Sequence, residues 1–176
     1  MFKRMLKNER GLTLIELLAV IVILGIVAAI AIPAIGGVID NSKKDAHASN
    51  AQQMINAAKI AVTADKDLIP ANGKYTLVTL EYLEDKGYLE TVKDPDGGTN
   101  SYEKGTGAQQ MQTGLSSDPK ADYSYVLIKN NNNKLSYFVK LINNERGVHN
   151  SGAAVEEQNL KRSVVGPATT NNASGS

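Results

Sequence analysis

Glu16 is the residue of this sequence whose chemistry most needs an explanation. It is the only charged side chain in the stretch from Gly11 to Ile39, which is otherwise almost wholly apolar. A carboxylate at the centre of a membrane helix costs on the order of 2.5–3.5 kcal/mol, and less near an end, so it usually has a partner. No lysine or arginine lies within the stretch. A cut after Gly11 would place the new amine of Leu12 about one helical turn from Glu16, where the two could pair within one chain or between neighbours.

A second candidate chemistry is calcium binding by aspartates in the later part of the chain. Carboxylate oxygens are the hard ligands that calcium prefers. The candidates are Asp94, Asp96, Asp118 and Asp122. Their spacing does not match an EF-hand loop, and aspartate is common in turns without any metal. We therefore expect no metal site.

The sequence contains no set of residues typical of an enzyme. It lacks the G-x-S-x-G and H-E-x-x-H motifs and a phosphate-cradling glycine loop. His47 and His149 lie far apart, and we expect His47 to be exposed to solvent and without a role. There is no cysteine, which excludes disulfides and thiolate sites. The formal net charge of +1 gives no reason to expect nucleic acid as a partner, and we expect neither enzymatic activity nor a cofactor.

The apolar stretch around Glu16 sets the organisation of the chain. It is longer than the roughly 20 residues that a helix needs to cross a bilayer. It follows a short basic segment, residues 1–11, which should stay in the cytoplasm and send the C-terminal part outside. Two other interpretations stay open. The segment could be an ordinary signal peptide cut after Ala29-Ile30-Ala31, or an uncut anchor of an extracellular binding protein.

Beyond the apolar stretch the pattern of a helix continues to about Asp65. Apolar residues recur there at spacings of three and four: Ala51, Met54, Ile55, Ala58, Ala61 and Val62. We predict one helix from about Leu12 to Asp65, apolar on all sides over residues 12–39 and on one stripe over residues 40–65. Pro33 should kink this helix because it removes a backbone donor and clashes with the preceding turn. Gly25 weakens it through low helix propensity.

The part of the chain from residue 40 to 165 is typical of a small water-soluble domain. Pro70 and Asn72-Gly73 predict a loop over residues 68–78. Thr79 and Gly87 predict the cap and the stop of a short helix over residues 79–87. Residues rich in glycine, serine, threonine and glutamine predict a long surface loop over 97–121.

The last third of the chain predicts a β-hairpin over residues 123–142. Its two apolar runs are separated by Asn130 to Asn133, and asparagine tolerates the left-handed backbone of a tight turn. We expect one face of the hairpin to cover the stripe of the helix. Residues 143–154 predict a loop, residues 155–165 fit either a strand or a short helix, and residues 166–176 predict a disordered tail. The fold class is α+β, a long N-terminal helix packed on a small antiparallel sheet.

Arg10-Gly11-Leu12-Thr13-Leu14-Ile15-Glu16 resembles the prepilin processing motif of type IV pilins and the related pseudopilins. In that family a membrane peptidase cuts after the glycine and N-methylates the new first residue. The resemblance therefore implies a cut between Gly11 and Leu12 and methylation of Leu12, which replaces the usual phenylalanine. It also implies that Glu16 pairs with the amine of an adjoining subunit. The resemblance covers about the first third of the chain.

The same resemblance implies a pilin fold, assembly into a helical filament, and a set of partners. These are further copies of the chain, the membrane, the prepilin peptidase, and an assembly platform protein with its ATPase. Gly25 and Pro33 would bound a segment that loosens as subunits pack. The stretch TLEYLEDKGYL and the following D-P-x-G turn are similar to pseudopilins and Gram-positive pilins, and some pseudopilins bind calcium in the head.

Within this family, the full-sized head and the presence of Glu16 favour an abundant pilus subunit over a minor one or a pseudopilin. The absence of cysteine fits a Gram-positive source better than a Gram-negative one. A pseudopilin of a type II secretion or competence apparatus is the alternative. In either role, the chain would be a single-pass membrane protein before assembly and a subunit of an external filament afterwards.

Overall fold

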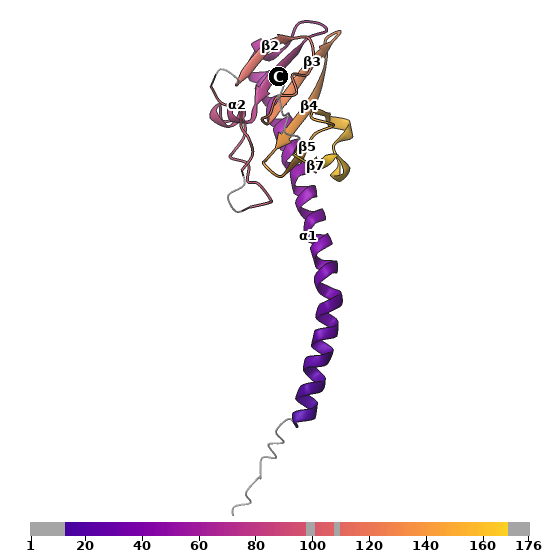
Figure 1. Ribbon diagram of the computed structural model, residues 1–176. Helices are drawn as coiled ribbons and strands as arrows, with labels where there is room; N and C mark the ends of the chain where they lie inside the picture. The colour runs from indigo at the N-terminus through magenta and orange to yellow at the C-terminus, as the bar shows by residue number, and fades with distance from the viewer. Residues whose placement is uncertain (1–12, 98–100, 108–109, 169–176) are drawn as a thin grey trace, which may run out of the picture. The chain divides into compact units, whose positions relative to one another are not determined.

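Helix α1, Leu14–Ala64, is the longest element of the chain (Figure 1). The computed structural model describes residues 13–97, 101–107 and 110–168. The chain divides into two compact units, Met1–Asp40 and Asn41–Ser176, and α1 contributes to both. The second unit is called the head below. The helix runs through Gly25 and Pro33, so the predicted long N-terminal helix is confirmed.

The head contains short helices and an antiparallel sheet. Its α-helix and 3-10 helices are Lys66–Leu68, α2 at Leu80–Asp85, Glu157–Asn159 and Arg162–Val164. Its strands are β1 Tyr75–Thr79, β2 Met111–Leu115, β3 Tyr125–Asn131, β4 Lys134–Ile142, β5 Arg146–Val148, β6 Val155–Glu156 and β7 Val165–Pro167. The strand order is β2-β1-β3-β4-β5-β7, with β6 paired to β4. This arrangement confirms the predicted α+β fold.

Strands β3 and β4 form the predicted hairpin, and their pairing ends at Asn131 opposite Lys134. The two residues between them, Asn132 and Asn133, have positive φ angles of 51° and 64°. Two successive left-handed residues make the tight turn whose twist matches that of antiparallel strands, and asparagine adopts that conformation at little cost. The side chain of Asn130 also accepts a hydrogen bond from the backbone N–H of Asn133 at 2.9 Å.

The core of the head lies between one face of the sheet and the second half of α1. The buried stripe of α1, which includes Met54, Ile55 and Ala58, belongs to the same apolar cluster as Val126 and Ile128 of β3. A second cluster on alternate positions of the strands includes Leu77, Tyr125 and Leu127. This alternation follows from the two-residue period of a β-strand and confirms that the hairpin covers the stripe of the helix.

Helix α2 begins as its sequence predicts. Thr79 has an extended backbone and its hydroxyl accepts a hydrogen bond from the backbone N–H of Tyr82 at 3.1 Å, which caps the first turn. Gly87, with a φ angle of +72°, follows the last turn. Tyr82 and Leu83 are buried in the same cluster as α1.

Several segments that were expected to be loops contain strands. Strand β1 begins within the predicted loop 68–78 and ends at Thr79, β2 lies in the predicted loop 97–121, and β5 lies within residues 143–154. Residues 155–165 adopt neither a single strand nor a single helix, but two short strands with 3-10 turns between them. Strands β2 and β5 are short and contain glycine, so their own sequences carry little signal, whereas β1, YTLVT, is rich in residues that favour strands.

The predicted disordered tail was placed too early. Gly166 and Pro167 belong to β7, where they pair with Gly147 and Arg146 of β5. The backbone N–H of Ala168 donates to the carbonyl of Glu145 at 2.9 Å, and residues 169–176 lie outside the described residues.

Candidate functional site

The first turn of α1 holds the carboxylate of Glu16 in a reciprocal cap. Glu16 Oε2 accepts hydrogen bonds from the backbone N–H of Thr13 at 2.9 Å and from the Thr13 hydroxyl at 2.8 Å. Thr13 Oγ1 in turn accepts from the backbone N–H of Glu16 at 3.3 Å. Threonine followed three residues later by glutamate is the sequence of a capping box, which satisfies helix donors that otherwise lack partners. Gly11 and Leu12, the predicted processing site, lie outside the described residues.

The half of α1 that follows this cap presents apolar side chains in every direction. The large apolar side chains from Leu14 to Ile39 are between 47% and 85% exposed. Full burial of a valine, leucine or isoleucine side chain gives about 1.5–3 kcal/mol, and in water each of these side chains forgoes the part that corresponds to its exposed area. Within the described residues, α1 is the one helix that is long and apolar enough to cross a membrane by length and composition, and it lies near the N-terminus. These properties are compatible with membrane anchoring.

Gly25 and Pro33 both lie inside this exposed part of α1. A side chain built at Gly25 would meet nothing within 4 Å, so packing within the chain does not require glycine there. Pro33 is the proline inside the helix, where it cannot donate a backbone hydrogen bond. The loosening role of both residues stays a prediction.

A second polar site lies in the head, around His47 of α1. We expected His47 to be exposed and without a role, and this was wrong: the residue is fully buried, with an exposed fraction of 0%. Its Nε2 lies 3.0 Å from Asp96 Oδ2, and its Nδ1 lies 2.8 Å from the hydroxyl of Tyr102. The rings of His47 and Tyr102 meet edge to face at 5.6 Å between centroids. Both nitrogens of the imidazole therefore have a partner inside the head.

The directions of these hydrogen bonds follow from what each group can donate. Asn50 Nδ2 donates to the hydroxyl oxygen of Tyr102 at 3.0 Å, which leaves the tyrosine O–H to donate to His47 Nδ1. Asp96 can only accept when ionised, so His47 Nε2 carries the proton and donates to it. The result is one chain of hydrogen bonds from Asn50 through Tyr102 and His47 to Asp96.

Asp94 and Asp96 flank Pro95 in a turn that is itself built by hydrogen bonds. Asp94 Oδ1 accepts from the backbone N–H of Asp96 at 2.9 Å, and the carbonyl of Asp94 accepts from Gly97 N–H at 3.2 Å. Both carboxylates are nearly inaccessible, with side chains 2% exposed. Buried carboxylates of this kind require either a cation or several donors.

Donors and cations from three other segments supply that compensation. Asn143 Nδ2 donates to Asp94 Oδ2 at 2.6 Å and to Asp96 Oδ2 at 3.0 Å. Its amide oxygen accepts two backbone N–H groups, which fixes its NH2 toward the carboxylates. Arg146 Nε lies 3.2 Å from Asp96 Oδ2, and Lys43 Nζ lies 3.7 Å from Asp96 Oδ1. Burial opposes ionisation of Asp96, but the bonds from Asn143 and His47 and the nearby positive charge outweigh it and lower its pKa.

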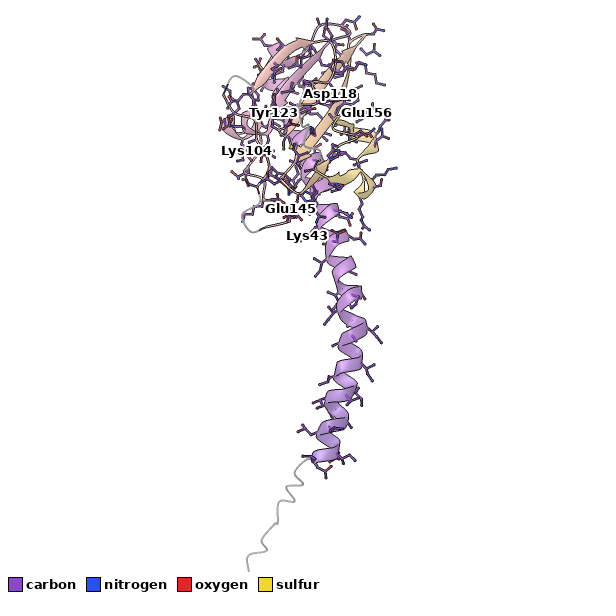
Figure 2. All side chains as sticks on the ribbon, in the orientation of Figure 1. Lys43, Lys104, Asp118, Tyr123, Glu145 and Glu156 are labelled. Atoms are coloured by element: carbon purple, nitrogen blue, oxygen red, sulfur yellow. The ribbon has the colours of Figure 1, made fainter. Side chains whose placement is uncertain are left out.

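The four aspartates considered as calcium ligands do not converge. Asp118 accepts from the Tyr125 hydroxyl at 2.6 Å and from the backbone N–H of Ala154 at 2.6 Å, away from His47. Figure 2 shows Asp118 well separated within the head from Lys43, which contacts Asp96. The segment that carries Asp118 and Asp122 surrounds a buried ammonium, because Lys140 Nζ donates to the carbonyl of Ala121 at 2.6 Å.

His47, Asp94 and Asp96 nevertheless place possible metal-ligating atoms within 4.8 Å of one another. The donor set does not favour a metal ion. Two carboxylates already face two cations, Lys43 and Arg146, which compensate their charge. A divalent ion would add two positive charges next to the guanidinium and would face the amide N–H groups of Asn143.

Sequence reasoning missed His47 and its partners, although one signal was present. His47 is four residues before Ala51 and seven before Met54, so it lies on the same side of the helix as the buried stripe. Extending the stripe back by one turn would have placed His47 in the core. Its partner Tyr102 is far away in the sequence and had no signal of its own, and the same holds for Asn143 and Arg146, which contact Asp96.

Comparison with known proteins concerns the N-terminal segment. Residues 6–32 match the family described as the prokaryotic N-terminal methylation motif. No curated protein and no solved structure matches the chain. The matched range includes Gly11, Leu12 and Glu16, and it supports a type IV pilin-like or pseudopilin protein. The chain carries the N-terminal methylation motif that forms the class III leader of type IV pilins and pseudopilins.

Proposed function

We propose that the chain is a structural subunit of a type IV pilus or a pilus-like filament. It is inserted in the membrane as a precursor, cut after Gly11, N-methylated on Leu12, and polymerised through the apolar half of α1. The motif matched at residues 6–32 supports this proposal, because it belongs to a class of structural proteins that are processed in this way. The basic leader stays in the cytoplasm and the head lies outside.

The observation that carries the proposal is the apolar surface of residues 14–39 with its single carboxylate. Side chains exposed in every direction can be covered by lipid before assembly and by the helices of neighbouring copies afterwards. Lipid already shields these side chains from water, so close packing and polar contacts must drive helices to leave it for one another. A filament with a core of stacked helices meets this requirement.

Glu16 gives the stacked helices their register. In the single chain its carboxylate accepts hydrogen bonds from the backbone N–H and the hydroxyl of Thr13, which are neutral donors. Processing creates a charged amine on Leu12 of each copy, and that amine is the partner of Glu16 in an adjoining subunit. An ion pair in apolar surroundings is far stronger than the same pair in water, so one axial position is favoured over the others. Gly25 and Pro33 allow the helix between them to adjust as the subunits pack.

The experiment is electron microscopy of cells that express Glu16→Ala or Glu16→Gln, with immunoblotting of membranes for precursor and processed chain. We expect processed subunits in the membrane and few or no filaments, because the register contact is lost. Glu90→Gln is the matched control, since Glu90 is an exposed glutamate of the head. Wild-type amounts of filaments in the Glu16 variants would remove the proposed role of Glu16.

The proposal implies several partners. Processing needs the prepilin peptidase, and polymerisation needs an assembly platform protein with its ATPase. A pseudopilin of a type II secretion or competence apparatus would share the same chemistry and differ in filament length. Long surface filaments in micrographs of wild-type cells favour the pilus, and a short structure seen only after overexpression favours the pseudopilus. A membrane-anchored binding protein would keep its leader and form no filament.

A further inference from the structure

We propose that His47 is a positioning residue that fastens the connecting segment of the head to α1 and thereby makes the subunit competent for assembly. The connecting segment is defined here as residues 88–97 and 101–107, which lie between α2 and β2. The assembly part of this inference rests on the proposed function. The fastening part concerns the head alone.

The connecting segment contains almost no regular hydrogen bonding of its own. Between α2 and β2 the described residues form neither an α-helix nor a strand. Backbone groups in such a segment must be satisfied by side chains and by neighbouring elements, or they face water. The position of the segment therefore depends on a small number of specific contacts.

His47 contacts both described parts of the connecting segment at once. One imidazole nitrogen bonds to Asp96 in the first part, and the other bonds to Tyr102 in the second part. Asn50, one turn further along α1, repeats the arrangement: its amide donates to the carbonyl of Lys93 at 3.0 Å and to the hydroxyl of Tyr102 at 3.0 Å. Two neighbouring side chains of one helix thus bind the segment at two places.

The connecting segment is also bound by residues at and just after the end of the β3–β4 hairpin. Asn143 and Arg146 bind the Asp94–Asp96 turn from the sheet, and the backbone N–H of Glu103 donates to the carbonyl of Ile142 at 2.9 Å. His47 is fully buried and binds both described parts of the segment, Asp96 in the first and Tyr102 in the second. Removing it leaves a buried carboxylate and a buried phenol each short of one hydrogen bond, a loss concentrated on this segment.

The consequence for assembly follows from where the segment is attached. It is bound to α1 at Lys43, His47 and Asn50, the first turns of the helix within the head. A subunit that packs its neighbours through residues 14–39 must also accommodate their heads. A segment with one fixed position presents one surface to those heads. A released segment adopts many conformations, so each contact with a neighbouring head would also cost the conformational entropy of ordering it.

The experiment on the head uses the full chain in detergent and measures amide hydrogen exchange by mass spectrometry. The variants are His47→Leu, which fills the space without hydrogen bonds, and His47→Gln, which keeps one donor and one acceptor. His149→Ala is the matched control, since this second histidine contacts Pro167 and Gly152 instead. We expect His47→Leu to raise exchange in residues 88–97 and 101–107 by roughly tenfold or more, with β3 and β4 unchanged.

The other results have defined meanings. An intermediate rise in His47→Gln supports the hydrogen bonds as the cause. Unchanged exchange in His47→Leu, or a rise that extends equally to β3 and β4, overturns the proposal, because His47 would then be an ordinary core residue.

The experiment on assembly counts filaments on cells that express the same variants at equal levels of processed subunit. We expect His47→Leu to lose most filaments, His47→Gln to keep part of them, and His149→Ala to match wild type. Normal filaments in His47→Leu would overturn the assembly half of the proposal. Absence of filaments from wild-type cells under every condition would sink the proposed function and leave the exchange result standing.

Discussion

His47 Nε2 and Asp96 Oδ2 lie 3.0 Å apart in the interior of the head, although the two residues are separated by 49 positions in the sequence. The contact joins the first turns of α1 within the head to the Asp94–Asp96 turn, which belongs to no helix or strand. It also gathers two cations and an amide around a buried pair of carboxylates. Asp96 Oδ1 is buried without a hydrogen-bond partner, but the other polar atoms of the cluster are paired, and such pairing favours one arrangement of the chain over its alternatives.

The lowered pKa of Asp96 predicts how the stability of the head depends on pH. The folded pKa lies below the unfolded pKa of about 4, so the unfolded chain binds the proton first. The stabilisation is complete above that pH and is lost as the pH falls through the folded pKa. We expect Asp96→Asn to lower the unfolding free energy at neutral pH by about 1–3 kcal/mol and to flatten the loss below pH about 4.

Denaturant unfolding of the full chain in detergent, followed by circular dichroism from neutral to acid pH, measures both effects. Asp85→Asn is the control, because Asp85 is exposed and contacts Gln110 at the surface. Equal pH profiles for wild type and Asp96→Asn would contradict the assignment of the acid-sensitive contact to Asp96.

Metal ions provide a second prediction about the same cluster. Lys43 and Arg146 already compensate the charge of Asp96, and Asn143 donates to both aspartates, so we expect no stabilisation by calcium or zinc at millimolar concentration and no loss on adding a chelator. The melting temperature of the full chain in detergent is the measurement. A rise that saturates with metal concentration would show a bound ion and would require Arg146 to move away from Asp96.

Thr13 is predicted to support Glu16 before assembly. Thr13→Val keeps the shape of the side chain and removes its hydroxyl, so Glu16 loses the 2.8 Å bond and keeps the bond to the backbone. We expect fewer filaments than wild type and more than Glu16→Ala, with the helix start weakened by about 1 kcal/mol. Thr63→Val, a substitution at an exposed threonine of the same helix, should have no effect. Filament yield per processed subunit decides between these outcomes.

The elements that could be predicted from sequence are those whose signals are local. Thr79 and Gly87 lie at the two ends of α2, and the asparagines before Lys134 form the turn of the hairpin. The apolar stripe of α1 predicted the face on which the sheet packs. In each case a short stretch of sequence contains the donor, the cap or the period that the structure uses.

The elements that could not be predicted depend on partners elsewhere in the chain. Strand β2 has the sequence MQTGL, which contains Gly114 and two polar residues without a clear alternation, and it pairs with β1. Gly147 of β5 pairs with Ile142 of β4 and with Gly166 of β7. The strand β5 therefore forms only when β4 and β7 lie on either side of it. His47 could be placed in the core only by extending a helical period, and its bond to Asp96 had no signal in the sequence.

The most direct test of the central claim is the N-terminus of the mature chain. The wild-type protein is recovered from filaments or membranes. N-terminal sequencing and intact-mass measurement then identify its first residue and any methyl group on it. We predict that the chain begins at Leu12 and carries one N-methyl group, because Glu16 needs that amine in a neighbouring copy. A chain that begins at Met1, or just after Ala31, would contradict the account.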